Sequence, residues 1–255
     1  MDEFNKIFKS SVFGDEARCS DEQDEEINEF EEIGRKRKKK FDPYEANGGT
    51  VLAIAGADFA VVACDTRLSS GYNVTSQDQT KLFRMTKESM VASTGCWCDT
   101  LALTSLLEMR IQMYEQEHNK TMATDSLAQM ISIVMYNRRF FPYFTSSILA
   151  GLDRKGKGIV YYFDPVGHYE RCRYRALGTS YALLQPCLDE LLGWENLLPS
   201  KPVPVFNVSK QSAIEIAQKC LEIASDRDLF SGDKGEIQCI TKDGVTSTTI
   251  LLRGD

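Results

Sequence analysis

Short apolar runs rich in β-branched residues recur along the chain and predict strands. The runs Thr50–Ala55 and Phe59–Cys64 are separated by Gly56-Ala57-Asp58, a pattern typical of two strands joined by a tight turn. Met90–Thr94 predicts another strand, which ends at Gly95. Similar runs predict further strands over Ser146–Leu152, Gly158–Phe163, Tyr169–Ala176, Glu236–Thr241 and Val245–Leu252.

Longer segments with apolar residues at helical spacing predict helices between these strands. The first helix is expected to begin at Asp99 and to end near His118. Thr124 or Asp125 is expected to cap the second. Two more are predicted over Tyr181–Leu192 and Ser212–Asp226.

The order of these elements is strands, two helices, strands, two helices, strands. This order differs from the strand–helix–strand alternation that is typical of a parallel sheet. Two antiparallel sheets between two helix layers would bury both faces of each sheet, which explains strands that are apolar throughout. We therefore predict an α+β fold, a four-layer αββα sandwich of two antiparallel sheets.

Residues 1–40 differ in composition from the rest of the chain. They contain twelve Asp or Glu and nine Lys or Arg, separated into an acidic block, Asp21–Glu32, and a basic run, Arg35–Lys40. Such a segment buries too little apolar area to offset its ordering entropy, so we expect a disordered tail. The basic run is compatible with a solvated charge block, a nuclear-import signal or a processing site. The sequence thus predicts a tail over 1–40 and one domain over 41–255.

Composition restricts the classes of partner and cofactor. The 255 residues are 42% hydrophobic and 26% charged, which is typical of a globular protein. A net charge of −7 argues against nucleic acid as the main partner. Because no apolar run approaches the roughly 18 residues of a membrane span and no signal region is evident, we expect a soluble intracellular protein without a membrane partner. Eight cysteines without Cys-x-x-Cys, and two histidines, favour reduced thiols over a metal site.

Polar residues at the ends of predicted elements are the candidates for chemistry. No phosphate-binding loop, dinucleotide fingerprint or zinc-protease motif is present, so no cofactor is expected. Each polar group taken alone fits a turn, a helix cap or a surface ion pair. The groups are Asp65-Thr66-Arg67, Lys81, Gly178-Thr179-Ser180, Asp226-Arg227-Asp228 and Ser231-Gly232.

Together these groups resemble the proteasome beta-subunit family. The resemblance is carried by Asn47–Gly56, Ala63–Arg67, Ser93–Gly95 and Asp226–Asp228 followed by Ser231-Gly232. Further motifs narrow it to one subunit type of the eukaryotic core particle, namely Phe41–Tyr44, Arg139–Tyr143, Gly151–Asp153, Gly156–Gly158 and Tyr162–Gly167. It extends from about residue 41 to the end and implies the N-terminal-nucleophile hydrolase fold, an αββα sandwich.

The resemblance implies a test for the nucleophile. Active members expose an N-terminal threonine whose hydroxyl attacks the peptide bond while its amine serves as base. When Gly49 is placed at that position, the family spacing reaches Leu52-Ala53, Asp65 and Lys81, which all match. When Thr50 is placed there, the same spacing reaches Ala53-Ile54, Thr66 and Leu82, which all fail. Gly49, which has no hydroxyl, is therefore expected at the nucleophile position.

The resemblance also places the other catalytic positions of the family. They correspond to Asp65, Lys81, Asp228 and Ser231, with Thr179 where active members carry serine. Without a nucleophile these residues are expected to be structural, so the sequence predicts an inactive subunit. The alternative is an active threonine protease that uses Thr50.

The expected role is that of a structural subunit in ATP- and ubiquitin-dependent protein degradation. The resemblance implies assembly with other beta subunits in a seven-membered ring, with an alpha ring and with the opposing beta ring, in cytoplasm and nucleus. Asp153 resembles a loop position that borders a neighbour's specificity pocket, although a turn aspartate is an equally good reading. Processing is expected near Lys40 or Phe41.

Overall fold

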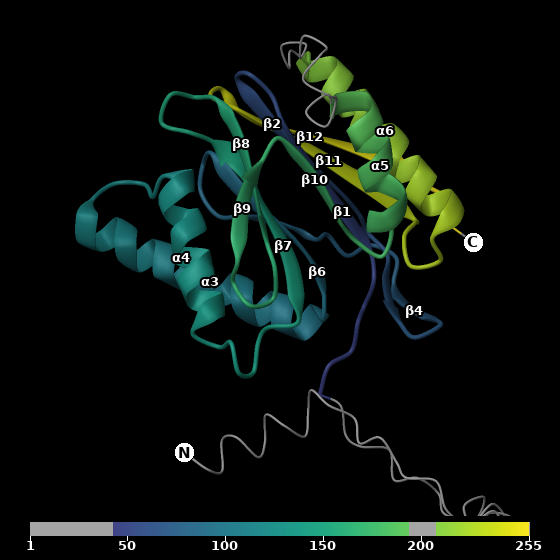
Figure 1. The fold of residues 1–255 in the computed structure, drawn as a ribbon, viewed down its shortest axis with the longest axis horizontal. Helices are drawn as coiled ribbons and strands as arrows, with labels where there is room; N and C mark the ends of the chain where they lie inside the picture. The colour runs from purple at the N-terminus through teal and green to yellow at the C-terminus, as the bar shows by residue number, and fades with distance from the viewer. Residues whose placement is uncertain (1–42, 194–207, 255) are drawn as a thin grey trace, which may run out of the picture. The chain divides into compact units, whose positions relative to one another are not determined.

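Two five-stranded antiparallel sheets pack against each other between two pairs of helices (Figure 1). The computed structural model describes residues 43–193 and 208–254. The predicted four-layer αββα order is confirmed. The predicted tail, 1–40, and the predicted processing residues Lys40 and Phe41 lie outside the described residues.

The first sheet carries helices α5 and α6 on its outer face. Its spatial order is β10-β1-β2-β11-β12. The strands are β10 (Tyr174–Gly178), β1 (Thr50–Ala55), β2 (Phe59–Asp65), β11 (Lys234–Thr241) and β12 (Gly244–Leu251), and the helices are α5 (Tyr181–Leu192) and α6 (Lys210–Arg227).

The second sheet carries α3 and α4. Its order is β5-β6-β7-β8-β9, and a separate two-stranded ribbon pairs β3 with β4. The strands are β5 (Leu82–Arg84), β6 (Ser89–Gly95), β7 (Thr145–Leu152), β8 (Gly158–Phe163), β9 (Tyr169–Cys172), β3 (Leu68–Ser70) and β4 (Asn73–Ser76), and the helices are α3 (Trp97–His118) and α4 (Thr124–Tyr136).

Strand β1 shows why the strands read as continuous apolar runs. Leu52 and Ile54 belong to the core between the first sheet and its helices, whereas Val51 and Ala53 belong to the core between the two sheets. Successive side chains of a strand point to opposite faces, and here both faces are buried. Alternation of apolar and polar residues is therefore absent, as expected for the inner layers of a sandwich.

One predicted strand is wrong. The run Tyr169–Ala176 is divided between β9, which pairs with β8, and β10, which pairs with β1. The chain thus passes from one sheet to the other between Cys172 and Tyr174. Local hydrophobicity cannot show this division, because pairing partners are chosen by residues far away in the sequence. Strands β3, β4 and β5 were not predicted, since each has only three or four residues.

The predicted cap of α4 is also wrong. The N-cap is Ala123, which makes no side-chain cap hydrogen bond. The hydroxyl of Thr124 instead donates to the carbonyl oxygen of Leu152 in β7 at 2.6 Å. A tertiary hydrogen bond has replaced the local one, because the helix start packs directly on the sheet.

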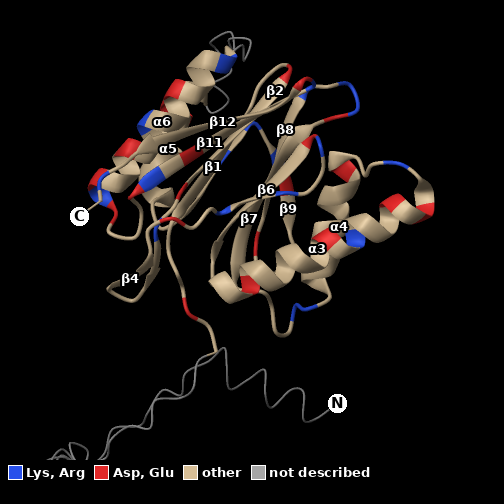
Figure 2. Cartoon of the chain, turned by 180° about the vertical axis from the view of Figure 1, so that it is seen from behind, with Lys and Arg blue, Asp and Glu red and all other residues tan. Residues whose placement is uncertain are grey.

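Charged residues lie mainly on turns and helices, and α6 carries several of them (Figure 2). Asp65 and Lys81 are exceptions, because both are buried. Within the described part of the chain, no helix is long and apolar enough to cross a membrane. The buried charges therefore direct attention to the end of the first sheet where they lie.

Candidate functional site

The predicted site residues come together at one end of β1 and β2. Gly49 immediately precedes β1, Asp65 ends β2, and Lys81 immediately precedes β5. Hydrogen bonds connect this group to Thr179 and, through Thr50, to Ser231. Five separate segments of the sequence thus contribute to one cluster.

Lys81 is the most deeply buried cation at this site, with 1% of its side chain exposed. Its Nζ donates to the backbone oxygen of Asp65 at 2.8 Å, to Oδ1 of Asp65 at 2.9 Å and to the backbone oxygen of Arg67 at 2.7 Å. An ammonium group has three N–H donors. All three are engaged within the chain, so none is left to stabilise a nucleophilic oxygen.

Asp65 is wholly buried and accepts hydrogen bonds on both carboxylate oxygens. Besides Lys81, Oδ1 accepts from the backbone nitrogen of Thr50 at 2.7 Å. Oδ2 accepts from the backbone nitrogens of Arg67 at 3.1 Å and Gly232 at 3.3 Å. Burial raises the pKa of Asp65, while the charge of Lys81 and these donors oppose the rise. The carboxylate therefore acts as a hub that joins β1, β2 and the segment after α6.

The side-chain position of Gly49 points at this ion pair. A Cβ added to Gly49 would lie 2.7 Å from Nζ of Lys81 and 3.0 Å from Oδ1 of Asp65, and closer still to Cε of Lys81. The φ angle of 90° at Gly49 also favours glycine. The geometry agrees with the register derived from the sequence, which puts position 49 opposite lysine and aspartate. That space is occupied by the lysine itself.

Thr50 lies in a different environment. Its side chain is wholly buried, and its hydroxyl shares a hydrogen bond of 2.7 Å with the hydroxyl of Ser231. All the donors of Lys81 go elsewhere. The Thr50 hydroxyl is thus part of a packed network and does not face the lysine.

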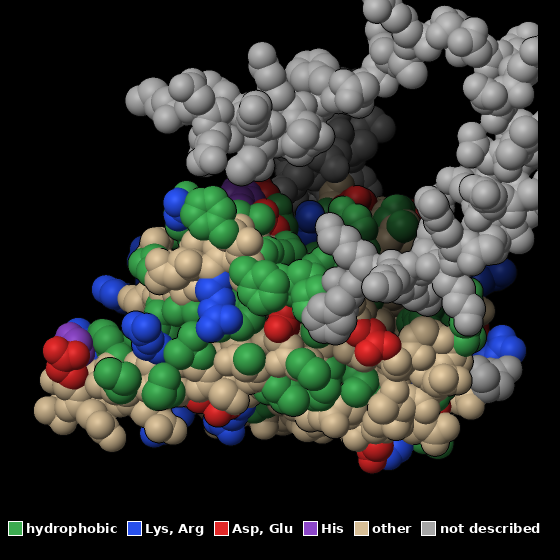
Figure 3. Space-filling view, turned by 90° about the horizontal axis from the view of Figure 1, so that it is seen from below, with side chains coloured by type: hydrophobic (Ala, Val, Ile, Leu, Met, Phe, Trp, Pro, Cys, Tyr) green, Lys and Arg blue, Asp and Glu red, His purple; other side chains and the backbone are tan. Residues whose placement is uncertain are grey.

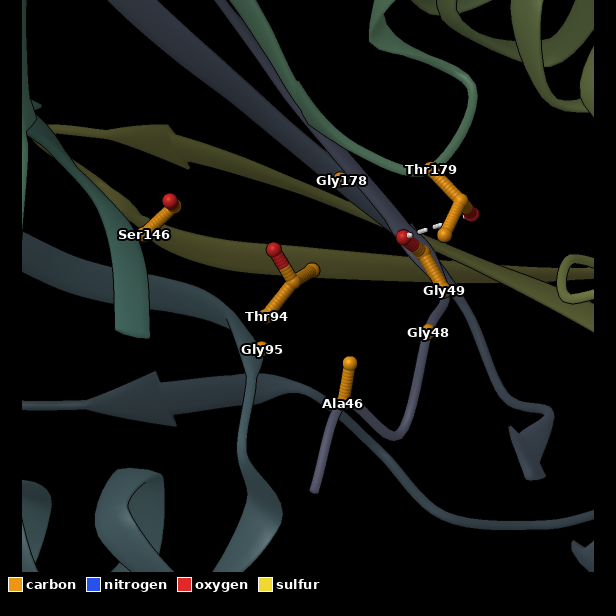
Figure 4. A pocket seen from close by; sticks show the side chains of 8 residues that line it. All are labelled: Ala46, Gly48, Gly49, Thr94, Gly95, Ser146, Gly178 and Thr179. Carbon is orange, nitrogen blue, oxygen red and sulfur yellow. Dashed lines mark hydrogen bonds between the residues drawn. The ribbon is translucent and has the colours of Figure 1, made fainter. Parts of the chain in front are cut away.

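Asp228 accepts hydrogen bonds from the remaining hydroxyl groups of the site. Its Oδ2 accepts from Ser231 at 2.7 Å and from Ser180 at 2.8 Å, and it also accepts from Thr179. The hydroxyl of Thr179 has a single proton, which can be donated either to Asp228 or to the backbone oxygen of Gly49, 3.4 Å away (Figure 4). Both Thr179 and its neighbour were among the polar candidates of the sequence, but a family catalytic position was assigned only to Thr179 and not to Ser180, which is wholly buried. The only signal for Ser180 was its place in the same Gly-Thr-Ser triplet.

A pocket of about 220 Å³ opens beside this cluster. In Figure 4, Thr94 and Ser146 lie across it from Gly49 and Thr179. Among the described residues, none of those that line it is charged; they are Ala46, Gly48, Gly49, Thr94, Gly95, Ser146, Gly178 and Thr179. The pocket therefore offers hydroxyl groups and backbone but no acid or base.

Asn47 fixes the segment that leads into the site. Its backbone nitrogen donates to the oxygen of Gly95 at 2.9 Å, and its backbone oxygen accepts from the nitrogen of Ser69 at 3.1 Å. Its side-chain amide donates to the oxygen of Ser69 at 2.9 Å and accepts from the nitrogen of Trp97 at 2.8 Å. One residue thus bridges β3 and the start of α3, and holds the chain across the pocket before it reaches Gly49.

Comparison with known proteins identifies the family. A family model described as proteasome subunit matches residues 45–240. The chain belongs to the proteasome subunit family.

Several relatives in this family share most of their length with the chain. Proteasome subunit beta type-1 of Drosophila melanogaster is 50% identical over 215 residues, which are 84% of this chain and 91% of the relative. Proteasome subunit beta type-1-B of Carassius auratus is 44% identical over 216 residues, covering 85% and 90%. Proteasome subunit beta type-1 of Petunia hybrida is 38% identical over 222 residues, covering 86% and 99%. The predicted resemblance to a single beta-subunit type is confirmed, and that type is beta type-1.

Asp153 lies apart from this cluster of the proteasome subunit, in the turn between β7 and β8. Its Oδ1 accepts from the backbone nitrogens of Lys155 at 2.8 Å and Lys157 at 2.9 Å. These backbone donors, that of Lys157 foremost, lower the pKa of Asp153. The carboxylate thus stabilises its own hairpin turn, as the turn reading of the sequence predicted, and its contribution to a neighbour stays a prediction.

A second buried ion pair borders the site and was not predicted as a pair. Nε of Arg67 lies 2.9 Å from Oδ2 of Asp233, and another N–H of Arg67 donates to the oxygen of Leu229 at 3.0 Å. This pair ties the end of β2 to the segment before β11. Among residues 43–193 and 208–254, no three His, Cys, Asp or Glu side chains are placed to hold a metal ion.

Proposed function

We propose that this chain is a non-catalytic beta subunit of the proteasome core particle, a structural component in ATP- and ubiquitin-dependent protein degradation. The family and the beta type-1 relatives support the role of a core beta subunit. One observation carries the non-catalytic part of the proposal. The position that faces Lys81 and Asp65 is Gly49, which has no hydroxyl.

The environment of Lys81 supports the same conclusion. Covalent catalysis by a hydroxyl requires a neighbouring group that takes its proton or lowers its pKa. Every N–H of Lys81 already has an acceptor within the chain. Removing one partner of a buried ion pair is strongly destabilising, so a structural role is a sufficient reason for the pair to be present.

An active threonine protease that uses Thr50 is the alternative function. It would need the Thr50 hydroxyl beside Lys81, whereas that hydroxyl is bonded to Ser231. It would also need a free amine at Thr50, whose nitrogen instead donates to Asp65 within the sheet. The geometry therefore favours the non-catalytic subunit.

The experiment combines a threonine-directed epoxyketone probe with intact mass measurement on purified particles. We expect no label on this chain while active subunits in the same particles are labelled, which serves as the internal control. We also expect the mature chain to begin near Lys40 or Phe41. A mature chain that begins at Thr50 and carries the label would overturn the proposal.

Assembly is supported by an exposed aromatic surface. Phe140 is 88% exposed, and Tyr136, Phe141 and Phe144 are also exposed. They belong to the end of α4 and the loop that leads into β7, and Figure 3 shows hydrophobic side chains gathered on the corresponding underside of Figure 1. Large exposed apolar patches mark interaction sites. We infer contacts with other beta subunits of a seven-membered ring, with an alpha ring and with the opposing beta ring.

Asp153 is proposed to shape the specificity pocket of a neighbouring active subunit. Asp164 offers a matched control, because its Oδ1 accepts from Val166 and His168 in the same kind of turn, between β8 and β9. Asp153→Ala should change the peptide preference of assembled particles, and Asp164→Ala should leave it unchanged. Equal preferences for both variants would remove this role.

Cytoplasmic and nuclear localisation is proposed from the same resemblance. Fractionation of cells followed by detection of the chain should recover it in both compartments. Replacing the basic residues of Arg35–Lys40 with Gln tests whether this run directs nuclear import. A chain confined to the cytoplasm in its unaltered form would contradict the proposed distribution.

A further inference from the structure

Arg175 places a guanidinium group at the open edge of the layer between the two sheets. It lies in β10, the edge strand of the first sheet, directly opposite Ala53 of β1. Residues two apart on a strand share a face. Leu177, on the same face of β10, belongs to the core between the sheets. Arg175 therefore stands at the rim of that core, where it meets the surface.

Two aromatic rings hold the guanidinium group. Its central carbon lies 4.2 Å from the ring centre of Tyr162 in β8 and 5.3 Å from that of Tyr181 at the start of α5. The rings come from the other sheet and from the helix layer, so three layers meet at this residue. Stacking on aromatic faces fixes the plane of a guanidinium without using its N–H donors.

The donors of Arg175 have no acceptor among the described residues. Within the described part of the chain, its side chain makes no hydrogen bond or ion pair, and its Nε is buried without a partner. Arg67 shows the contrast, since its guanidinium donates to Asp233 and to the oxygen of Leu229. A buried donor without an acceptor is unfavourable and rare in native structures. The terminal N–H groups of Arg175 are not among the buried orphaned atoms, so they are the donors that an acceptor from outside the chain can reach.

The shape and charge of the guanidinium group indicate the kind of acceptor that it fits. A guanidinium presents a planar fork that matches the two oxygens of a carboxylate, and arginine and tyrosine are enriched among residues that dominate protein interfaces. The arrangement fits a carboxylate side chain better than a neutral acceptor.

We propose that Arg175, held between Tyr162 and Tyr181, is the docking site for an Asp or Glu side chain of an adjoining subunit in the assembled particle. This inference rests on the proposed function as a particle subunit. It adds a specific contact and the chemistry of its partner, neither of which follows from family membership.

The test replaces Arg175 with lysine and treats assembled particles with a carbodiimide, which joins a lysine amine to a carboxylate in direct contact through an amide bond. Mass spectrometry should find residue 175 joined to an Asp or Glu of another subunit. Arg84→Lys is the control, because the Nε of Arg84 already donates to Thr86 within the chain, so no such product is expected there. A product confined to this chain, or no product at residue 175 in particles that contain the variant, would overturn the proposal.

A second measurement on the unaltered chain covers the case in which the lysine variant fails to assemble. Arginine-directed dicarbonyl labelling of residue 175 should be at least about ten-fold slower in intact particles than in the dissociated chain, a difference of about 1.4 kcal/mol in protection. Equal labelling would overturn the proposal. If the unaltered chain itself is absent from purified particles, the proposed function fails instead, so the two failures are distinguishable.

Discussion

Lys81 and Arg175 are two cations of one fold that are used in opposite ways. Lys81 is buried, and each of its three donors meets an acceptor from β2 or the turn that follows it. Arg175 lies at the rim of the core, and its side chain meets two aromatic rings but no acceptor among the described residues. A cation whose N–H donors all have acceptors within the chain stabilises the fold, whereas a cation with donors that lack acceptors can still bind a partner. The comparison supports the proposal that the cluster around Lys81 is structural and that a partner is recognised at Arg175.

The largest expected effect is the difference in stability between a variant of Lys81 and a variant of Arg175. Lys81→Met leaves the Asp65 carboxylate buried without its counter-charge, so we expect the free energy of unfolding to fall by about 3–5 kcal/mol. Arg175→Met breaks no hydrogen bond within the described chain but loses the contacts with two aromatic rings, so we expect a smaller loss of about 1 kcal/mol. Urea denaturation of the recombinant chain measures both.

The double variant Lys81→Met with Asp65→Asn is the control for this first prediction. It removes both charges and leaves no unpaired buried carboxylate, so it should be more stable than Lys81→Met alone. The effects of the two substitutions are not additive because the two residues are in contact. Similar losses for Lys81→Met and Arg175→Met would show that the two cations are not used differently.

A smaller loss of stability is expected from a substitution at Gly49, which lies beside Lys81. Gly49→Ala puts a methyl group against Lys81 at a positive φ angle, and we expect a loss of about 2–3 kcal/mol. Gly71 is the matched control, since it also has a positive φ but an added Cβ would meet nothing within 4 Å. Gly71→Ala should cost only about 1 kcal/mol, because the backbone strain is its only penalty. Equal losses would mean that the space beside Lys81 is not filled.

The smallest expected effect is on the alkylation rate of the cysteine thiol that lies near each cation. Burial raises the pKa of Cys64, near Lys81, and of Cys172, near Arg175, to about 12 in both cases. Only the thiolate reacts with alkylating agents, so well below that pKa both thiols are neutral and unreactive, and their rates should rise with pH. At pH 8 iodoacetamide should modify the exposed Cys98 first, as followed by mass spectrometry. Modification of all three at one rate would contradict the burial on which the comparison depends.

The main layers of the fold could be predicted because their signals are local. The runs that form β1, β2, β7 and β8 are mostly apolar, and the helical spacing of apolar residues can be recognised within the residues of a single helix such as α3. The spacing of Asp65 and Lys81 from Gly49 identified the candidate site by comparison with a family pattern. Short strands and the division between β9 and β10 were missed, since pairing across sheets leaves no trace in a few residues.

Parts of the site were missed for a similar reason. Asn47 is one asparagine in a glycine-rich segment, and its role depends on Ser69, Gly95 and Trp97, which only the fold brings beside it. Ser180 looked like a helix-start residue, but its hydroxyl is directed to Asp228 across the site. Hydrogen bonds between residues so far apart in the sequence have no local signature.

The sequence by itself determined the order of layers, because hydrophobic periodicity acts over neighbouring residues, and it determined that no hydroxyl stands at position 49. Tertiary structure decided which polar groups are satisfied. Lys81 has three acceptors, and Arg175 has none among the described residues. Both outcomes depend on carbonyl groups and rings from distant segments, whose positions are set only when the two sheets and their helices pack together.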